Sequence, residues 1–131
     1  MQIQQQLRGT GVAVITPFTI DNKIDFPALG KVIEHLIVNK VEYLVLLGTT
    51  GETPVLSNPE KIAILDYSYD LVNNRVPIVV GIGGNDTADL IHDLANFPLE
   101  KAAAILSASP YYNKPSQEGI FQHYKMIAAA S

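Results

Sequence analysis

The chain has 131 residues, enough for one ordinary domain or part of a larger one, and 47% of them are hydrophobic, which predicts a substantial core. Its net charge is −4 without a cluster of Lys and Arg, which argues against nucleic acid or an anionic membrane as a partner. It has no cysteine, no secretory signal and no bilayer-spanning apolar run, so we expect a soluble, cytoplasmic protein without disulfides or thiolate metal sites.

The first half of the chain alternates between short apolar runs and segments with apolar residues at helical spacing. The run Gly11–Phe18 is typical of a buried strand, and Asp25 is placed to cap the helix that follows. A second strand is expected over Glu42–Gly48. Ser57 and Glu60 have the spacing of a capping box, which predicts the start of a second helix.

The second half of the chain repeats this pattern. Pro77–Gly83 is expected to form a third strand, and Asn85 or Asp86 to cap a third helix. Ala102–Ser109 has the pattern of a fourth strand, and Ser116 that of a fourth helix start. Strands that are apolar throughout and alternate with helices indicate an α/β fold, with a parallel sheet covered by helices. No linker or low-complexity segment divides the chain, so we expect a single domain.

Polar residues follow every predicted strand, whereas the strand starts carry no comparable motif. In parallel α/β folds, ligands bind beyond the carboxyl ends of the strands. The most distinctive of these segments is GTTGE, Gly48–Glu52, which follows the second predicted strand. Its two glycines allow a sharp turn close to a ligand, and its amides and threonine hydroxyls can hold a carboxylate or phosphate. Taken alone, the motif is better explained as an ordinary βα turn capped by threonine.

A second motif, SPYYNKPSQEG at Ser109–Gly119, is more specific. Together with GTTGE and the opening VAVITPF, it resembles the dihydrodipicolinate synthase family of the pyruvate-dependent class I aldolase superfamily, which includes N-acetylneuraminate lyase. The resemblance runs from about Gly11 to the end of the chain. It implies a (β/α)8 TIM barrel, which takes roughly 250 residues. We therefore expect residues 1–131 to hold the first four βα units, the N-terminal half of one barrel domain.

The resemblance also implies an activity that needs no cofactor. Family members condense pyruvate, bound to a lysine as a Schiff base, with aspartate semialdehyde in the first committed step of lysine biosynthesis. By this resemblance Thr50, with Gly48 and Gly51, holds the pyruvate carboxylate. Thr49 links two tyrosines in a proton relay, and Tyr112 is one of those tyrosines.

The resemblance further implies a homo-oligomer, a dimer of dimers. In the family, the tyrosine that matches Tyr112 reaches into the active site of the neighbouring subunit, and Tyr111 packs at the tight-dimer interface. A relay of hydroxyls is chemically reasonable, because each one can donate and accept a proton without a buried charge. Outside this motif, both tyrosines would be interpreted as ordinary aromatic packing.

Several catalytic groups of the family are expected to lie outside this chain. The resemblance places the Schiff-base lysine on the sixth strand, the second relay tyrosine on the fifth, and an arginine at the site entrance beyond this segment. A Schiff-base lysine must be partly neutral near pH 7, which requires desolvation or a nearby cation. The lysines that are present fall on predicted helices, before a strand or in polar loops: Lys23, Lys31, Lys40, Lys61, Lys101, Lys114 and Lys125. We expect the chain alone to be inactive.

Some family members are inhibited by lysine at the dimer interface, and Asn85, Asp89 and Tyr111 match positions of that site. Asn58 and Lys61, however, stand where lysine-sensitive relatives carry histidines. A cation at position 61 repels a lysine ligand. We therefore expect weak or absent feedback inhibition.

Two alternative functions are retained. The first is a sugar-acid aldolase of the same superfamily, against which PYYNKPSQEG argues. The second is a non-catalytic fragment that acts in assembly only, and the expected lack of a competent lysine supports it. A metal site is not expected, because His35, His92 and His123 fall on three different predicted helices without metal-ligand spacing.

Overall fold

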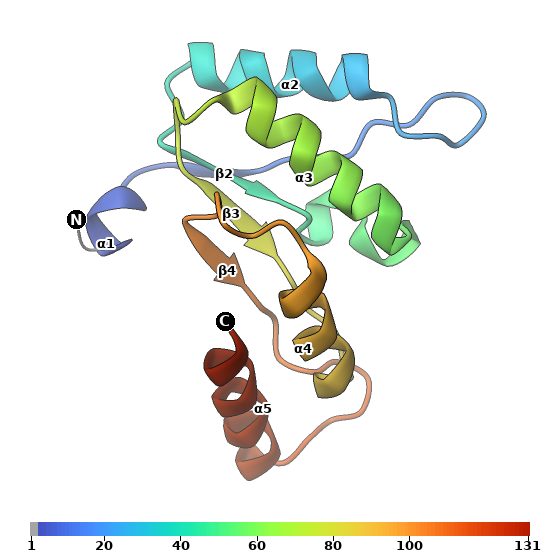
Figure 1. The fold of residues 1–131 in the computed structure, drawn as a ribbon, viewed down its shortest axis with the longest axis vertical. Helices are drawn as coiled ribbons and strands as arrows, with labels where there is room; N and C mark the ends of the chain where they lie inside the picture. Colours follow the sequence, from blue (N-terminus) through green and yellow to red (C-terminus); the bar gives the residue numbers. More distant parts are fainter. Residues whose placement is uncertain (1–2) are drawn as a thin grey trace.

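Four parallel strands lie side by side in the order β1-β2-β3-β4 in the computed structural model, which describes residues 3–131 (Figure 1). Every neighbouring pair is parallel, so the carboxyl ends of all four strands lie at one edge of the sheet. The strands span Gly11–Ala13 (β1), Tyr43–Leu46 (β2), Ile78–Gly81 (β3) and Ala104–Leu106 (β4). The predicted parallel α/β fold is confirmed.

A helix follows each strand, as predicted. The helices span Ile3–Gln6 (α1), Phe26–Val38 (α2), Asn58–Val72 (α3), Thr87–Asn96 (α4) and Gln117–Ala130 (α5), with 3-10 turns at Thr49–Gly51 (η1) and Thr53–Val55 (η2). The side chain of Asp25 accepts a hydrogen bond from the Ala28 N–H at 2.9 Å, so the predicted cap of α2 is confirmed. The capping box of Ser57 and Glu60 is present, and Asp86 rather than Asn85 caps α4.

The strands end earlier than the apolar runs predicted. Beyond β1 the ladder continues through one bond from the Val14 N–H to the Val45 carbonyl, at 2.9 Å, and Pro17 has no N–H to extend it. Beyond β2, Leu47 adopts a φ of +57°, a left-handed conformation that takes the chain out of the strand direction. The apolar side chains of these two runs indicate burial, but they do not show where the backbone hydrogen bonds between the strands end.

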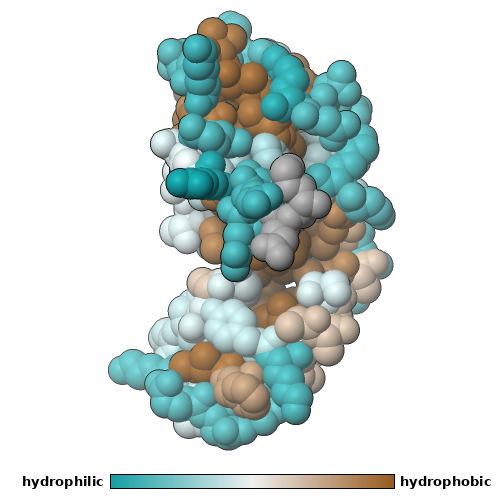
Figure 2. Space-filling model, turned by 90° about the vertical axis from the view of Figure 1, so that its left-hand side faces the viewer, coloured by the Kyte–Doolittle hydropathy of each residue, from teal (hydrophilic) through white to brown (hydrophobic). Residues whose placement is uncertain are grey.

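The two faces of the sheet differ in burial. On one face Leu44, Leu46 and Val80 are at most 1% exposed and belong to the core shared with the helices. On the other face the strand register aligns Ala13, Val45, Val79 and Ala104, and of these four residues only Val79 is buried. Figure 2 views the molecule from the left-hand side of Figure 1 and shows apolar residues, in brown, between polar ones. Two large apolar residues near the carboxyl ends of the strands are exposed. Ile15, just after β1, is 50% exposed, and Leu106, the last residue of β4, is 54% exposed.

Gly81, the last residue of β3, lies against the backbone that leaves β2. A Cβ atom at this position would lie 2.2 Å from the Leu47 carbonyl oxygen and 2.9 Å from the Gly48 nitrogen. Backbone atoms cannot move aside as the end of a flexible side chain can. The absence of a side chain at Gly81 therefore allows the turn after β2 to pack beside β3.

We predict that Gly81→Ala lowers the free energy of unfolding by about 1–3 kcal/mol, because the added methyl overpacks this contact. Gly84→Ala is the matched control, since its Cβ would meet the Leu90 side chain at an ordinary 3.5 Å. Its effect should stay within about 0.5 kcal/mol. Urea unfolding of both variants measures the difference, and equal losses of stability would contradict the close packing at Gly81.

Candidate functional site

The GTTGE segment forms a tight turn at the carboxyl end of β2. Two residues with left-handed backbone conformations bracket the turn, Leu47 with a φ of +57° and Glu52 with a φ of +55°. Between them, η1 is closed by 3-10 bonds, and both threonines of the motif are exposed. The hydroxyls of Thr49 and Thr50 are thus presented at the edge of the sheet where the sequence predicted a site.

Two further threonines, which sequence analysis did not assign to the site, fix the backbone of this turn. The buried Thr16 hydroxyl donates to the Gly51 carbonyl at 2.7 Å. The Thr53 hydroxyl lies 2.7 Å from the Leu47 carbonyl and 2.9 Å from the Gly48 carbonyl. In the sequence, one of these threonines lies near the end of the first apolar run and the other directly after GTTGE. Neither position indicates which backbone carbonyl its hydroxyl binds.

A cavity of about 310 Å³ opens beside the turn, between the carboxyl ends of β2, β3 and β4. Gly48 and Thr49 line it from the turn, Leu106 from β4 and Tyr111 from the segment after β4. The structure therefore brings Thr49 together with the first tyrosine of the SPYYN motif. A hydroxyl, backbone amides and a phenol around a partly apolar space can bind a small organic acid.

The remaining predicted residues of this site do not line that cavity within the single chain. Gly51 is buried beside Val14 and Thr16 at the end of β1, and Thr50, next to the cavity-lining Thr49, is exposed. Tyr112 has a left-handed backbone conformation, with a φ of +68°, and is 91% exposed, so its side chain makes little contact with its own chain. Thr49 and Tyr112 consequently do not share a cavity within a single chain.

A second cavity, of about 380 Å³, gathers the residues predicted for an interface or effector site. Asn85, Asp89 and Tyr111 all line it, so Tyr111 contributes to both cavities. The Asn113 side chain donates to the Asn85 carbonyl at 3.3 Å and ties the SPYYN segment to the loop before α4. The two cavities are therefore neighbours across Tyr111.

Lys61 adds a positive charge to this second cavity. Its ammonium donates to the Asn58 side-chain oxygen at 3.2 Å, and the Asn58 amide donates to the Asp93 carboxylate at 3.0 Å. All three residues line the cavity. A lysine ligand would meet the Lys61 cation there as well as the carboxylates.

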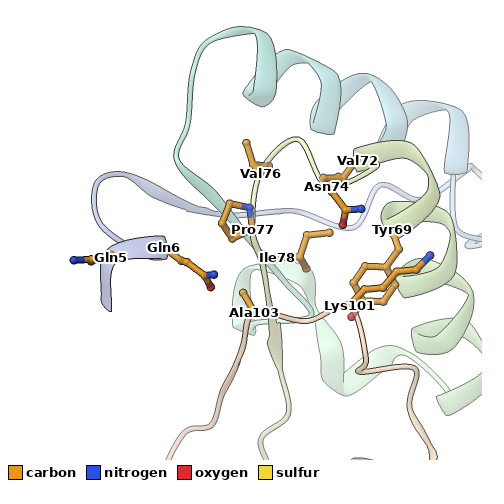
Figure 3. Close-up of a pocket in the computed structure, with 10 residues that line it drawn as sticks. All are labelled: Gln5, Gln6, Tyr69, Val72, Asn74, Val76, Pro77, Ile78, Lys101 and Ala103. Carbon is orange, nitrogen blue, oxygen red and sulfur yellow. The ribbon is translucent and has the colours of Figure 1, made fainter. Parts of the chain in front are cut away.

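Cavity size alone does not locate the predicted site. A larger cavity, of about 480 Å³, lies at the amino ends of β3 and β4 and is lined in part by Gln5, Gln6, Tyr69 and Lys101 (Figure 3). Burial and nearby carboxylates, chiefly that of Glu100, raise the pKa of the Tyr69 phenol to about 12. This phenol stays protonated at neutral pH, and the cavity lies at the end of the sheet away from the GTTGE turn.

Groups for other kinds of chemistry do not gather in the described part of the chain. Within residues 3–131, no group of three or more His, Asp or Glu is positioned to hold a metal ion. In the same span, no helix combines the length and the apolar character that a membrane crossing needs. Among the lysines, Lys61 is half-buried and the other six are exposed, and none lines the cavity beside GTTGE.

Comparisons with known proteins agree with this architecture. The sequence model of the dihydrodipicolinate synthetase family matches residues 6–131. The 4-hydroxy-tetrahydrodipicolinate synthases of Azobacteroides pseudotrichonymphae and Parabacteroides distasonis are 50% and 51% identical over 125 residues, which is 95% of this chain and 42% of theirs.

Solved structures show the same relationship. The synthase of Methylacidiphilum fumariolicum is 41% identical with a TM-score of 0.89, over 95% of this chain and 41% of that chain. The Acinetobacter baumannii synthase, solved in complex with pyruvate, is 39% identical with a TM-score of 0.90, over 94% and 42%. The chain thus spans less than half the length of these relatives. With a matching family model and this similarity along nearly its whole length, the chain belongs to the dihydrodipicolinate synthetase family, and its four βα units are of that family's TIM barrel.

Proposed function

We propose that residues 1–131 form the N-terminal half of a TIM-barrel lyase that condenses pyruvate with aspartate semialdehyde to 4-hydroxy-tetrahydrodipicolinate. Pyruvate reacts as a Schiff base with a lysine, and the reaction is the first committed step of lysine biosynthesis. The observation that carries the proposal is the GTTGE turn, which opens onto a cavity at the carboxyl ends of three strands. The names of relatives that are 50% identical support the substrate assignment.

In this proposal the turn binds the carboxylate of pyruvate. Thr50 donates its hydroxyl and its N–H, and the small residues Gly48 and Gly51 let the carboxylate approach the backbone. N–H groups at the start of a helical turn have no acceptor within that turn, so they are available to a ligand. Binding one end of pyruvate in this way orients its carbonyl carbon toward the attacking amine.

Protons move through Thr49 and Tyr112. Formation and collapse of the carbinolamine require proton transfer to and from oxygen, and a threonine between two phenols can transfer a proton in both directions. The 91% exposure of Tyr112 supports a role toward another subunit, because its ring does not contact the site of its own chain. Catalysis would then depend on the homo-oligomer.

The attacking amine is proposed to come from outside residues 1–131. Six of the seven lysines are exposed, and Lys61 is bound to Asn58 in the second cavity. A lysine that forms a Schiff base needs desolvation or a neighbouring cation, and exposure to solvent removes the first of these. We therefore propose that the 131-residue chain alone forms no pyruvate adduct, and that the site also needs the part of the barrel supplied in relatives by their remaining length.

We predict that borohydride with pyruvate labels a completed chain but not the 131-residue chain. The completed chain joins residues 1–131 to the C-terminal part of the Parabacteroides distasonis synthase. Borohydride reduces a lysine Schiff base to a stable amine, so intact mass spectrometry reports the adduct. The 131-residue chain should remain at 14.3 kDa, and the adduct on the completed chain should map beyond Ser131.

An adduct on the 131-residue chain would contradict the assignment of its lysines. An unlabelled completed chain that folds would contradict the pyruvate chemistry as a whole. Labelling without consumption of aspartate semialdehyde would instead favour the sugar-acid aldolase. These outcomes also separate the enzyme from a non-catalytic assembly fragment, for which no pyruvate adduct is expected in either form.

We predict that Thr49→Val and Tyr112→Phe each lower kcat of the completed chain by about 10²–10⁴-fold, the usual contribution of general acid-base catalysis, with little change in the KM for pyruvate. Mixing the two inactive variants should restore activity. In a mixed dimer, one site combines an intact Thr49 with the intact Tyr112 of the neighbouring subunit. Random mixing then restores roughly a quarter of the wild-type activity.

Thr50→Val is the contrasting control. It should raise the KM for pyruvate, because it removes a donor to the carboxylate that is present in both ground state and transition state. Failure of the mixed variants to recover activity, although they form mixed oligomers, would overturn the placement of Tyr112 in a shared site.

We predict that millimolar lysine inhibits the completed chain weakly or not at all, because the Lys61 cation lies in the cavity where the effector would bind. Replacing Asn58 and Lys61 together by histidine should increase the inhibition. Steady-state assays over a lysine titration measure both. Sub-millimolar inhibition of the unsubstituted protein would refute the prediction.

A further inference from the structure

Thr16 is one of the few buried polar side chains, with 6% of its surface exposed. Its hydroxyl donates to the Gly51 carbonyl, which is 35 residues away in sequence, at 2.7 Å. The strand ladder between β1 and β2 has already ended two residues earlier, at the bond from the Val14 N–H to Val45. The Thr16 hydroxyl is therefore a side-chain link between the end of β1 and the turn after β2.

Gly51 packs closely against the end of β1, where this hydrogen bond is made. A Cβ atom on Gly51 would lie 3.3 Å from the Val14 carbonyl oxygen and 3.5 Å from the Thr16 hydroxyl oxygen, so the turn is seated closely against β1. A carbonyl buried at such a contact needs a donor, since water cannot replace it. Without the Thr16 hydroxyl, the peptide after Gly51 would have to rotate toward solvent.

Rotation of that peptide would disturb the residues proposed to bind pyruvate. The turn is held at its start by Thr53, through the Leu47 and Gly48 carbonyls, and near its end by Thr16. Thr49 and Thr50 lie between these two attachments. Donors that are fixed before the ligand arrives bind it with less loss of entropy than mobile donors do.

We propose that Thr16 is a positioning residue for pyruvate: its hydroxyl holds the GTTGE turn in the conformation that receives the carboxylate. The inference rests on the proposed function of that turn. Thr16 does not line the cavity beside the turn, so it acts through Gly51 rather than by contact with the substrate. Its loss should therefore weaken pyruvate capture more than it changes later chemical steps.

The test compares Thr16→Val, which keeps the shape but removes the donor, with Thr16→Ser, which keeps the donor. Thr19→Val is the matched control, because its hydroxyl accepts one bond from the Lys23 N–H in an exposed loop. In the 131-residue chain, NMR follows the carbonyl carbon of Gly51 and the hydrogen exchange of the Glu52 amide. We expect Thr16→Val to shift that carbon and accelerate that exchange, and the two other variants to resemble the wild type.

In the completed chain, Thr16→Val should raise the KM for pyruvate by about tenfold, the effect of one hydrogen bond, and change the KM for aspartate semialdehyde far less. Thr16→Ser, which keeps the donor, should leave the pyruvate KM close to the value of the unsubstituted chain. A purely structural role predicts instead a lower melting temperature with both KM values unchanged.

The inference would be overturned if Thr16→Val left the Gly51 and Glu52 signals unchanged. It would also be overturned if Thr16→Val left the pyruvate KM unchanged while the unsubstituted completed chain forms the adduct. Either result leaves the proposed function standing. A wild-type completed chain that forms no pyruvate adduct would overturn the proposed function itself, while the NMR comparison would still report whether Thr16 fixes the turn. The two failures are therefore distinguishable.

Discussion

The parallel register of the sheet is the constraint on which the candidate site depends. Because Val45 pairs with Ala13 on one side and Val79 on the other, β2 is central among its neighbours and its carboxyl end lies beside theirs. The left-handed Leu47 then ends the strand and turns the chain across the sheet edge. Polar segments far apart in sequence are brought around one cavity as a result.

The site combines a rigid part with an exposed part. The GTTGE turn is bonded to β1 through Thr16 and fits beside β3 because Gly81 has no side chain. Tyr112, in contrast, projects into solvent from the segment after β4. A turn proposed to bind a carboxylate benefits from rigidity, whereas a residue proposed to serve a neighbouring subunit must extend beyond its own chain.

Local features of this structure were predictable from the sequence, and long-range ones were not. The caps at Asp25 and Ser57 rest on bonds to residues three positions away, so the sequence pattern contains both partners. The apolar run predicts that the second strand extends to Gly48, but β2 ends at Leu46. The left-handed Leu47 backbone that ends it packs against Gly81, a residue far away in the sequence. The bond from Thr16 to Gly51 joins residues 35 positions apart and leaves no local signal. The proposed role of Tyr112 in a neighbouring subunit depends on a contact between two chains, and no pattern within one sequence specifies such a contact.

A crystal structure of the completed chain with pyruvate bound would show directly which groups hold the carboxylate. We expect the pyruvate carboxylate within hydrogen-bond distance of the Thr50 hydroxyl and N–H, with the carbonyl carbon in the cavity between the ends of β2, β3 and β4. Pyruvate bound at the other end of the sheet, in the cavity beside Tyr69 and Lys101, would contradict it.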